Sequence, residues 1–152
     1  MAKQIYLFRN GRETIYLTLT PEDRDLEIAA SLESFIKKLN DESVNGALVV
    51  VEGQRDMDAL RALGFKGPII MLSHNQNLVG LTLLAEKYGK TILLLDFDRK
   101  GRILSKKAAT ILQEKKVKID LFYRRELAYL TKGRVVGIQE LIRYRDHLLG
   151  LE

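Results

Sequence analysis

Carboxylate side chains directly follow two short apolar runs of the sequence. Glu52 follows residues 49–51, and Asp96 and Asp98 follow residues 93–95. Three carboxylates that lie close together repel one another unless a cation or a proton lies between them. Carboxylate oxygens are ligands that suit Mg²⁺ or Mn²⁺. If the fold brings these residues together, we expect a divalent-metal site formed by Glu52, Asp96 and Asp98.

Phosphoryl transfer is the chemistry that such a site would serve. A divalent cation neutralises charge on a phosphate oxygen and lowers the pKa of a bound water molecule. Because Glu52 would lie beside two other carboxylates, we expect it to exchange protons with the attacking or leaving oxygen. Arg99 and Lys100 follow the two aspartates directly. They are either clamps for substrate phosphates or solvated loop charges, and the sequence leaves both readings open.

Neighbouring residues are expected to support the acids. Gly53 should let the backbone turn sharply, and Gly101 should do the same or approach a phosphate closely. Asp56 is expected to cap the helix that follows it. His74 follows another apolar run, where it is either a contact for substrate or metal, or an ordinary loop histidine.

Positive charge is concentrated in the last third of the chain. The net charge is +5, and the residues from 100 onward include 13 lysines and arginines but only 6 acids. This asymmetry favours a polyanionic partner such as nucleic acid, although a lysine-rich solvated surface gives the same pattern. We expect Arg124 and Arg125 to contact phosphates. Tyr123 beside them either stacks on a base or packs on the edge of a sheet.

Hydrophobic patterning predicts the elements that position these residues. Strands are expected over residues 47–51, 68–72, 91–95 and 117–121, the first two of them buried, and helices over residues 56–63, 77–88 and 100–115. Strands and helices that alternate with short connections predict right-handed βαβ crossovers and a parallel sheet. The fold class is therefore α/β, a Rossmann-like four-stranded parallel sheet flanked by helices. Its strands would place Glu52 and Asp96 at the carboxyl edge, where such sheets bind ligands.

Smaller elements precede and follow this core. Residues 5–19 predict a β-hairpin that turns at the Asn-Gly pair of residues 10–11. A helix should begin at Thr20 and stop near Asn40, and residues 138–149 should form one more helix. We divide the chain into an N-terminal hairpin and helix extension (residues 1–43), a core (residues 44–123) and a basic C-terminal helical extension (residues 124–152).

Composition excludes several classes of function. Cysteine is absent, which removes disulfides, cysteine nucleophiles and cysteine-ligated zinc. No apolar run approaches the roughly 20 residues that span a bilayer, and the N-terminus lacks the apolar stretch of a secretion signal. We expect a cytoplasmic protein without a membrane partner.

The two acidic segments together resemble the Toprim domain of topoisomerases, bacterial-type primases, recombination-repair proteins and certain nucleases. Val-Glu-Gly-x-x-Asp at residues 51–56 precedes Asp-x-Asp-x-x-Gly at residues 96–101. The resemblance, over residues 44–121, implies that Glu52 acts as a general acid or base or helps to hold metal. It likewise implies metal binding by Asp96 and Asp98. It also implies that Gly53 and Gly101 are turn glycines.

Two positions depart from the topoisomerase pattern. Where topoisomerases often carry Asp-Pro-Asp-Arg-Glu-Gly, this chain has Phe97 and Lys100 in place of the proline and the glutamate. All three acids remain, so the resemblance still implies a metal site. The short chain is similar to the small stand-alone Toprim proteins of archaea, which are grouped with a bacterial ribosomal-RNA maturation nuclease.

Three functional hypotheses follow. The first is a Mg²⁺- or Mn²⁺-dependent phosphoryl-transfer enzyme, foremost a nuclease, acting on structured RNA or DNA. The second is a non-catalytic module that binds metal and nucleic acid and acts with a partner protein. The third is a primase-like activity. The sequence leaves open the choice between RNA and DNA, the number of metal ions and the oligomeric state, a homodimer included.

Overall fold

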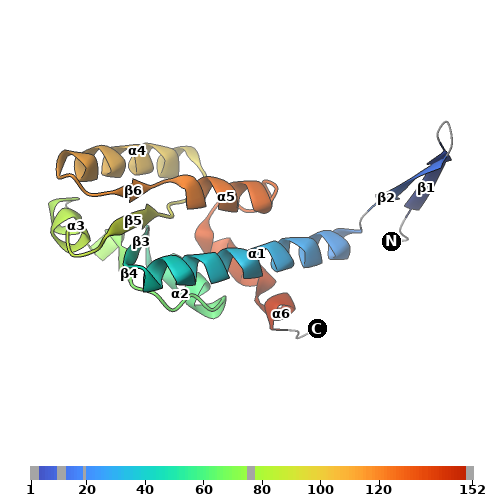
Figure 1. Cartoon of the computed structure of the whole chain (residues 1–152), viewed down its shortest axis with the longest axis horizontal. Coiled ribbons are helices and arrows are strands. Elements are labelled where there is room, and N and C mark those ends of the chain that lie inside the picture. The colour runs from blue at the N-terminus through green and yellow to red at the C-terminus, as the bar shows by residue number, and fades with distance from the viewer. Residues whose placement is uncertain (1–3, 10–12, 19, 75–77, 150–152) are drawn as a thin grey trace.

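The computed structural model describes residues 4–9, 13–18, 20–74 and 78–149, with side chains from Thr20 onward, those of His74 and Val79 excepted. Two antiparallel strands, β1 (Gln4–Arg9) and β2 (Glu13–Thr18), form a separate two-stranded sheet. Figure 1 draws this hairpin beyond the N-terminal end of helix α1. The strands confirm the predicted hairpin, whereas its Asn10-Gly11 turn lies outside the described residues.

Helix α1 (Pro21–Val44) begins where the sequence predicts. The Thr20 hydroxyl accepts the backbone N–H of Asp23, and the Asp23 carboxylate accepts the N–H of Thr20. The predicted end near Asn40 is wrong, because the helix continues for another turn. The Asn40 side chain is engaged elsewhere: its amide donates to the Gly64 carbonyl, and its oxygen accepts the N–H of Lys66.

The larger sheet has four parallel strands, as expected, and their order is β4-β3-β5-β6. Its strands are β3 (Ala47–Val51), β4 (Ile69–Met71), β5 (Lys90–Leu93) and β6 (Ile119–Asp120). Every residue of β3 is buried, since neighbours flank it on both sides. The prediction that residues 68–72 form a buried strand is only partly right. Strand β4 lies at the edge of the sheet, and its three residues are half-buried.

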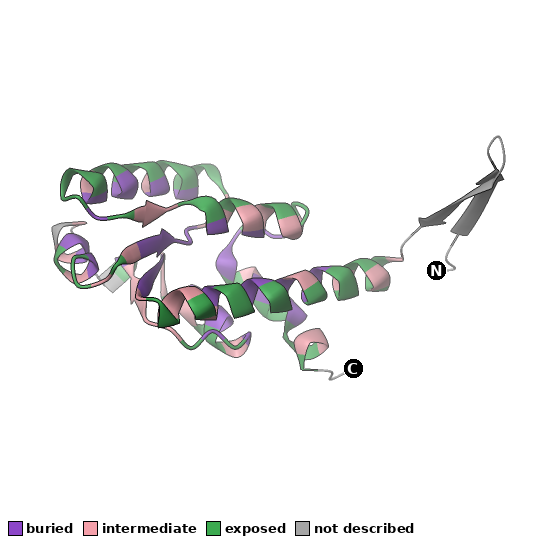
Figure 2. Cartoon of the chain, in the orientation of Figure 1, coloured by how far each residue is buried: buried purple, intermediate pink, exposed green. Residues whose placement is uncertain are grey.

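Two hydrophobic clusters cover the two faces of this sheet (Figures 1 and 2). On one face, Val49 and Val51 pack with α1, with α2 (Gln54–Ala62) and with α5 (Phe122–Leu130). On the other face, Leu48 and Val50 pack with α3 (Leu78–Ala85) and α4 (Arg99–Glu114). The alternation along β3 is what a strand buried on both faces requires.

The C-terminal segment differs from its prediction. Instead of one helix over residues 138–149, it forms a 3₁₀-helix, η2 (Ile138–Tyr144), and a short helix, α6 (Arg145–Leu148). The buried side chains of η2 are Ile138, Leu141 and Tyr144. Their spacing of three residues matches the three residues per turn of a 3₁₀-helix, so one face of η2 enters the core. None of the helices formed by the described residues is long and apolar enough to cross a membrane.

Candidate metal and nucleic-acid site

The sheet brings the carboxyl ends of β3 and β5 side by side. Val50 pairs with Leu93 in the parallel register, and the Leu94 N–H donates to the Val50 carbonyl at 2.8 Å. Glu52 and Asp96 therefore leave the same edge of the sheet from neighbouring strands. This is the arrangement that the sequence predicts for these two acids.

Glu52 lies in a half-buried position beside one acid and one base. Burial raises the pKa of its carboxyl group, and a hydrogen bond and charge repulsion from Asp96 raise it further. The Lys100 ammonium group lies 3.6 Å from Glu52 Oε1 and opposes this shift. The Lys100 side chain is 81% exposed, so solvent screens this ion pair strongly. The Glu52–Asp96 pair thus has little compensating charge.

Asp96 is held by one backbone N–H and one side chain that come from distant parts of the chain. Its Oδ1 atom accepts the N–H of Ile138 at 3.1 Å. Its backbone carbonyl accepts the Arg124 guanidinium at 2.5 Å, and the same guanidinium binds the Leu95 carbonyl at 3.0 Å. Arg124, predicted to bind phosphate, therefore also holds the end of β5.

Asp98, the third predicted metal ligand, caps a helix. Its backbone turns directly into α4, and Oδ1 caps that helix by accepting the Gly101 N–H at 2.7 Å. Among the residues that the structure describes, no three histidine or acidic side chains are grouped so as to hold a metal ion. Metal ligation by Asp98 together with Glu52 and Asp96 stays a prediction.

Asp56 approaches this acidic pair more closely than the sequence indicates. Its carboxylate accepts the Gly53 N–H at 3.0 Å, which caps the start of α2, and the Gln139 N–H at 3.2 Å. The side chain is buried, and burial raises its pKa, with a further contribution from the charge of Asp96. Asp56 thus links α2, the acidic pair and the C-terminal segment.

The backbone amides of Ile138 and Gln139 are the site groups that sequence reasoning missed. They open η2, and the Glu140 carboxylate secures this turn by accepting the N–H groups of Val136 and Gly137. The spacing of Gly137 and Glu140 is a helix-start signal that can be read from sequence. Nothing in the sequence indicates that this helix start faces Asp56 and Asp96, because that depends on tertiary packing.

The two predicted turn glycines have different surroundings. A Cβ atom on Gly101 would lie 1.9 Å from the Asp96 carbonyl oxygen, so only glycine fits where α4 meets the end of β5. Gly53 has φ −151° and ψ −172°, an extended backbone that any residue adopts. Its nearest neighbour, the Ser73 hydroxyl, would lie 3.9 Å from an added Cβ. The structure gives no conformational reason for glycine at position 53.

Arg99 and Arg125, two predicted phosphate contacts, lie on different helices. Arg99 is exposed on the outer face of α4, near Lys100. Arg125 is exposed on α5 and lines a groove with Arg124. Tyr123 is buried against the core and donates to Glu42 at 3.0 Å, so the structure favours its packing role. The side chain of His74 lies outside the described residues.

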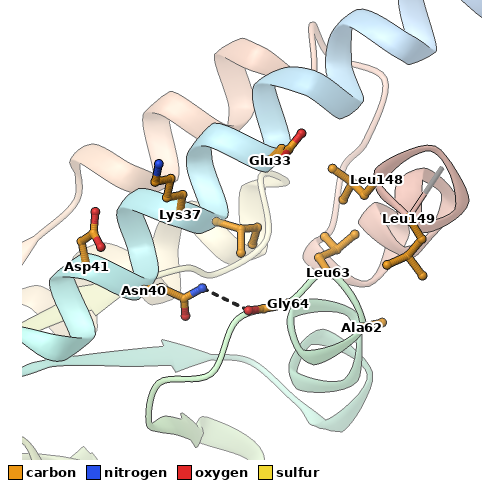
Figure 3. A pocket seen from close by; sticks show the side chains of 10 residues that line it. Glu33, Lys37, Asn40, Asp41, Ala62, Leu63, Gly64, Leu148 and Leu149 are labelled. Atoms are coloured by element: carbon orange, nitrogen blue, oxygen red, sulfur yellow. Dashed lines mark hydrogen bonds between the residues drawn. The ribbon is translucent and has the colours of Figure 1, made fainter.

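A hollow of about 300 Å³ opens between α1, the end of α2 and Leu148 (Figure 3). In Figure 3, Glu33 and Lys37 rim it on α1, and the Asn40 amide donates to the Gly64 carbonyl across it. Its lining includes none of Glu52, Asp56, Asp96 and Asp98. It is therefore separate from the acidic pair.

The donor groups beside the sheet edge fit a divalent cation. Glu52 and Asp96 offer hard carboxylate oxygens, and their mutual repulsion is relieved by a proton or by a cation. Asp98 lies two residues beyond Asp96, with one carboxylate oxygen committed to α4. The chemistry of the donors thus suits Mg²⁺ or Mn²⁺ better than a metal that prefers sulfur or nitrogen ligands.

A parallel α/β sheet with acids at the ends of adjacent strands defines a class of ligand-binding α/β domain. A family model described as the Toprim domain matches residues 47–129. The chain belongs to the Toprim domain family. Membership associates it with divalent metal and with nucleic acid, in agreement with the resemblance of the acidic motifs.

The chain is also similar to proteins of several organisms. A UPF0292 protein of Thermococcus gammatolerans is 42% identical over 118 residues, which cover 78% of this chain and 80% of that protein. A UPF0292 protein of Methanosarcina barkeri is 28% identical over 82% of this chain and 90% of its own length. A solved structure of a putative protein from Aquifex aeolicus has a TM-score of 0.62 and 29% identity, covering 72% of this chain and 96% of that one.

Proposed function

We propose that this Toprim domain is a Mg²⁺- or Mn²⁺-dependent phosphodiester-processing enzyme, a nuclease acting on structured RNA or DNA. The observation that carries the proposal is the meeting of Glu52 and Asp96 at the carboxyl edge of β3 and β5. Two half-buried carboxyl groups that repel each other do not stabilise the fold, which favours a functional role for the pair. Pairs of carboxyl groups with shifted pKa values cluster at functional sites that bind charged ligands or transfer protons.

Glu52, Asp96 and Asp98 are the residues that would hold the metal. A bound divalent cation would supply charge neutralisation on the phosphate and a more acidic water molecule. Ile138 N–H orients the Asp96 carboxylate, and Lys100 Nζ orients Glu52 Oε1. Glu52 would hold or move a proton at Oε1, the role that the family resemblance assigns to it. Arg99 and Lys100 supply positive charge for phosphate binding beside the pair.

A second candidate function is a non-catalytic module that binds metal and nucleic acid and acts with a partner protein. The observation that favours it is the capping bond from Gly101 to Asp98, which keeps the third predicted ligand on α4. A module of this kind has no use for Glu52 as a proton-transfer group. It would bind nucleic acid equally well with and without a functional Glu52. The structure offers no comparable observation for a primase-like activity.

Cleavage assays with matched variants separate the two candidates. Labelled structured RNA, single-stranded DNA and duplex DNA are incubated with the protein in Mg²⁺, Mn²⁺ or chelator. Glu52→Gln removes the charge and the proton-transfer group while keeping the shape. Glu86→Gln is the matched control, because Glu86 is exposed in the turn between the end of α3 and the start of β5.

The nuclease proposal expects metal-dependent cleavage that Glu52→Gln reduces by about 100-fold or more and that Glu86→Gln preserves. Both variants should unfold at the wild-type temperature within a few degrees. Cleavage that survives in Glu52→Gln would overturn the assignment of Glu52. No cleavage by the wild type, with salt-sensitive binding intact in every variant, would establish the module instead.

A further inference from the structure

A groove of about 410 Å³ runs between α4 and α5, beside the edge strand β6 (Figure 1). We call it the α4–α5 groove. Four of its lining residues are basic: Arg102, Lys106, Arg124 and Arg125. The other lining residues are neutral, and no aspartate or glutamate is among them. The groove therefore concentrates positive charge on one strip of the surface.

In the part of the chain that the structure describes, none of Arg102, Lys106 and Arg125 pairs with a carboxylate. Glu126, the acid on α5, instead accepts from Lys38 of α1. The Arg124 guanidinium is half-buried, and burial followed by repulsion from Arg102 lowers its pKa. Unpaired cations that crowd together favour an anionic ligand.

Two exposed aromatic rings lie on α5 beside this groove. Phe122 and Tyr129 are 55% and 85% exposed, and Arg125 lies between them on α5. Residues spaced three, four and seven apart share one face of a helix, so these three side chains form one strip. Tyr123 points the other way, into the core. The aromatic contact that the sequence suggested for Tyr123 is thus available at Phe122.

The groove begins beside the acidic pair. Arg124 binds the backbone carbonyls of Leu95 and Asp96, and α4 begins at the Asp98 cap one turn before Arg102. Along α4 the groove extends from Arg102 to Gln113. At 1.5 Å per residue this is about 16 Å, enough for several phosphates of one strand.

We propose that the α4–α5 groove binds a single-stranded stretch of the nucleic-acid substrate. Phosphates lie along Arg102, Lys106 and Arg125, and bases stack on Phe122 and Tyr129. Base stacking on exposed aromatic rings needs unstacked bases, which a duplex does not offer. The inference rests on the proposed function for its substrate class, nucleic acid, but it does not depend on cleavage.

Binding measured in chelator tests the groove separately from catalysis. Fluorescence anisotropy is followed with a labelled single-stranded RNA, a single-stranded DNA and the matching duplexes. The aromatic variant is Phe122→Ala with Tyr129→Ala, and the charge variant is Lys106→Gln with Arg125→Gln. Lys66→Gln is the matched control, because Lys66 is an exposed lysine remote from the groove lining.

We expect the wild type to bind single strands more tightly than duplexes. The aromatic variant should lose about tenfold or more of its affinity for single strands and almost none for duplexes. The charge variant should reduce the slope of log affinity against log salt concentration by an amount equal to about two phosphate contacts. Lys66→Gln should change neither this slope nor the affinity for single strands. All four substituted side chains of the groove are exposed, so thermal unfolding should match the wild type.

Equal affinity of the aromatic variant and the wild type for single strands would overturn the inference. A preference for duplex would also overturn it. So would the absence of binding to any oligonucleotide, and in that case the groove would be a surface for a protein partner. The proposed function fails in a different way, through cleavage that is absent or indifferent to Glu52→Gln. The two failures are therefore distinguishable.

Discussion

Gly101→Ala should disrupt the junction between β5 and α4. An added Cβ would lie 1.9 Å from the Asp96 carbonyl oxygen and 2.6 Å from its carbonyl carbon. Both are backbone atoms, so no side-chain rotation relieves the overlap. The Asp96 carbonyl is also the acceptor for Arg124, and the Gly101 N–H is the donor that Asp98 caps. A shift of more than an ångström would therefore weaken both bonds.

The expected loss is about 3 kcal/mol of unfolding free energy. Overpacking a rigid site costs about 1–3 kcal/mol, and each weakened hydrogen bond adds about 1 kcal/mol. The higher helix propensity of alanine returns about 1 kcal/mol. Urea unfolding followed by circular dichroism measures the change. Gly89→Ala is the control, since its Cβ would meet only the Gly46 carbonyl oxygen, at 3.8 Å, and should change stability by less than about 1 kcal/mol.

A loss of less than about 1 kcal/mol in Gly101→Ala would refute the reasoning. It would mean that the start of α4 can move away from the strand end at little cost. The capping bond to Asp98 would then not be held by close packing of α4 on Asp96. The candidate site would have to be considered adjustable rather than fixed by that junction.

Three further predictions concern other contacts. Lys90→Met should cost about 2 kcal/mol at neutral pH by unpairing Glu42, whose pKa Lys90 lowers chiefly by a hydrogen bond. A lowered carboxyl pKa stabilises the fold above about pH 4.5, and acidification removes that contribution. The difference in unfolding free energy between Lys90→Met and the wild type, measured by urea unfolding, should therefore shrink below about pH 4. Gly137→Ala should weaken Mn²⁺ binding several-fold in calorimetric titrations, since its Cβ would lie 3.0 Å from Asp96 Oδ1; unchanged affinity would contradict this. Asp56→Ala should lower the urea midpoint by an amount equal to about 2–3 kcal/mol, as two backbone N–H groups lose their acceptor, and a neutral effect would argue against that role.

The sheet could be predicted because its strands carry a local signal. Residues 47–51 form a continuous apolar run between turn-forming segments, and the observed strand β3 coincides with it. The start of α1 at Thr20 was equally legible, because a capping box is a local pattern. The parallel sheet then places Glu52 and Asp96 at one edge, whereas the adjacency of β3 and β5 is seen only in the structure.

The remaining features depend on tertiary contacts or on one dihedral angle. No helix is predicted directly after the strand expected over residues 117–121, yet α5 begins at Phe122, because Tyr123 and Leu127 pack into the core as a helical pair. Asp98 was expected beside Asp96, which holds only for an extended chain. The backbone turns into α4 at the next residue, and the same side chain becomes a cap.

The bonds from Asp56 to Gln139 and from Asp96 to Ile138 join residues 83 and 42 positions apart in the chain. Contacts of such long sequence separation form late, since the loops that they close carry a large entropic cost. On the ribosome, β3 and α2 emerge well before η2 does. Until then the two carboxylates have water in place of these amide donors. The hydrogen bonds at the acidic edge therefore form only when the segment that follows residues 47–129 packs against it. The site is complete only after the rest of the fold has formed.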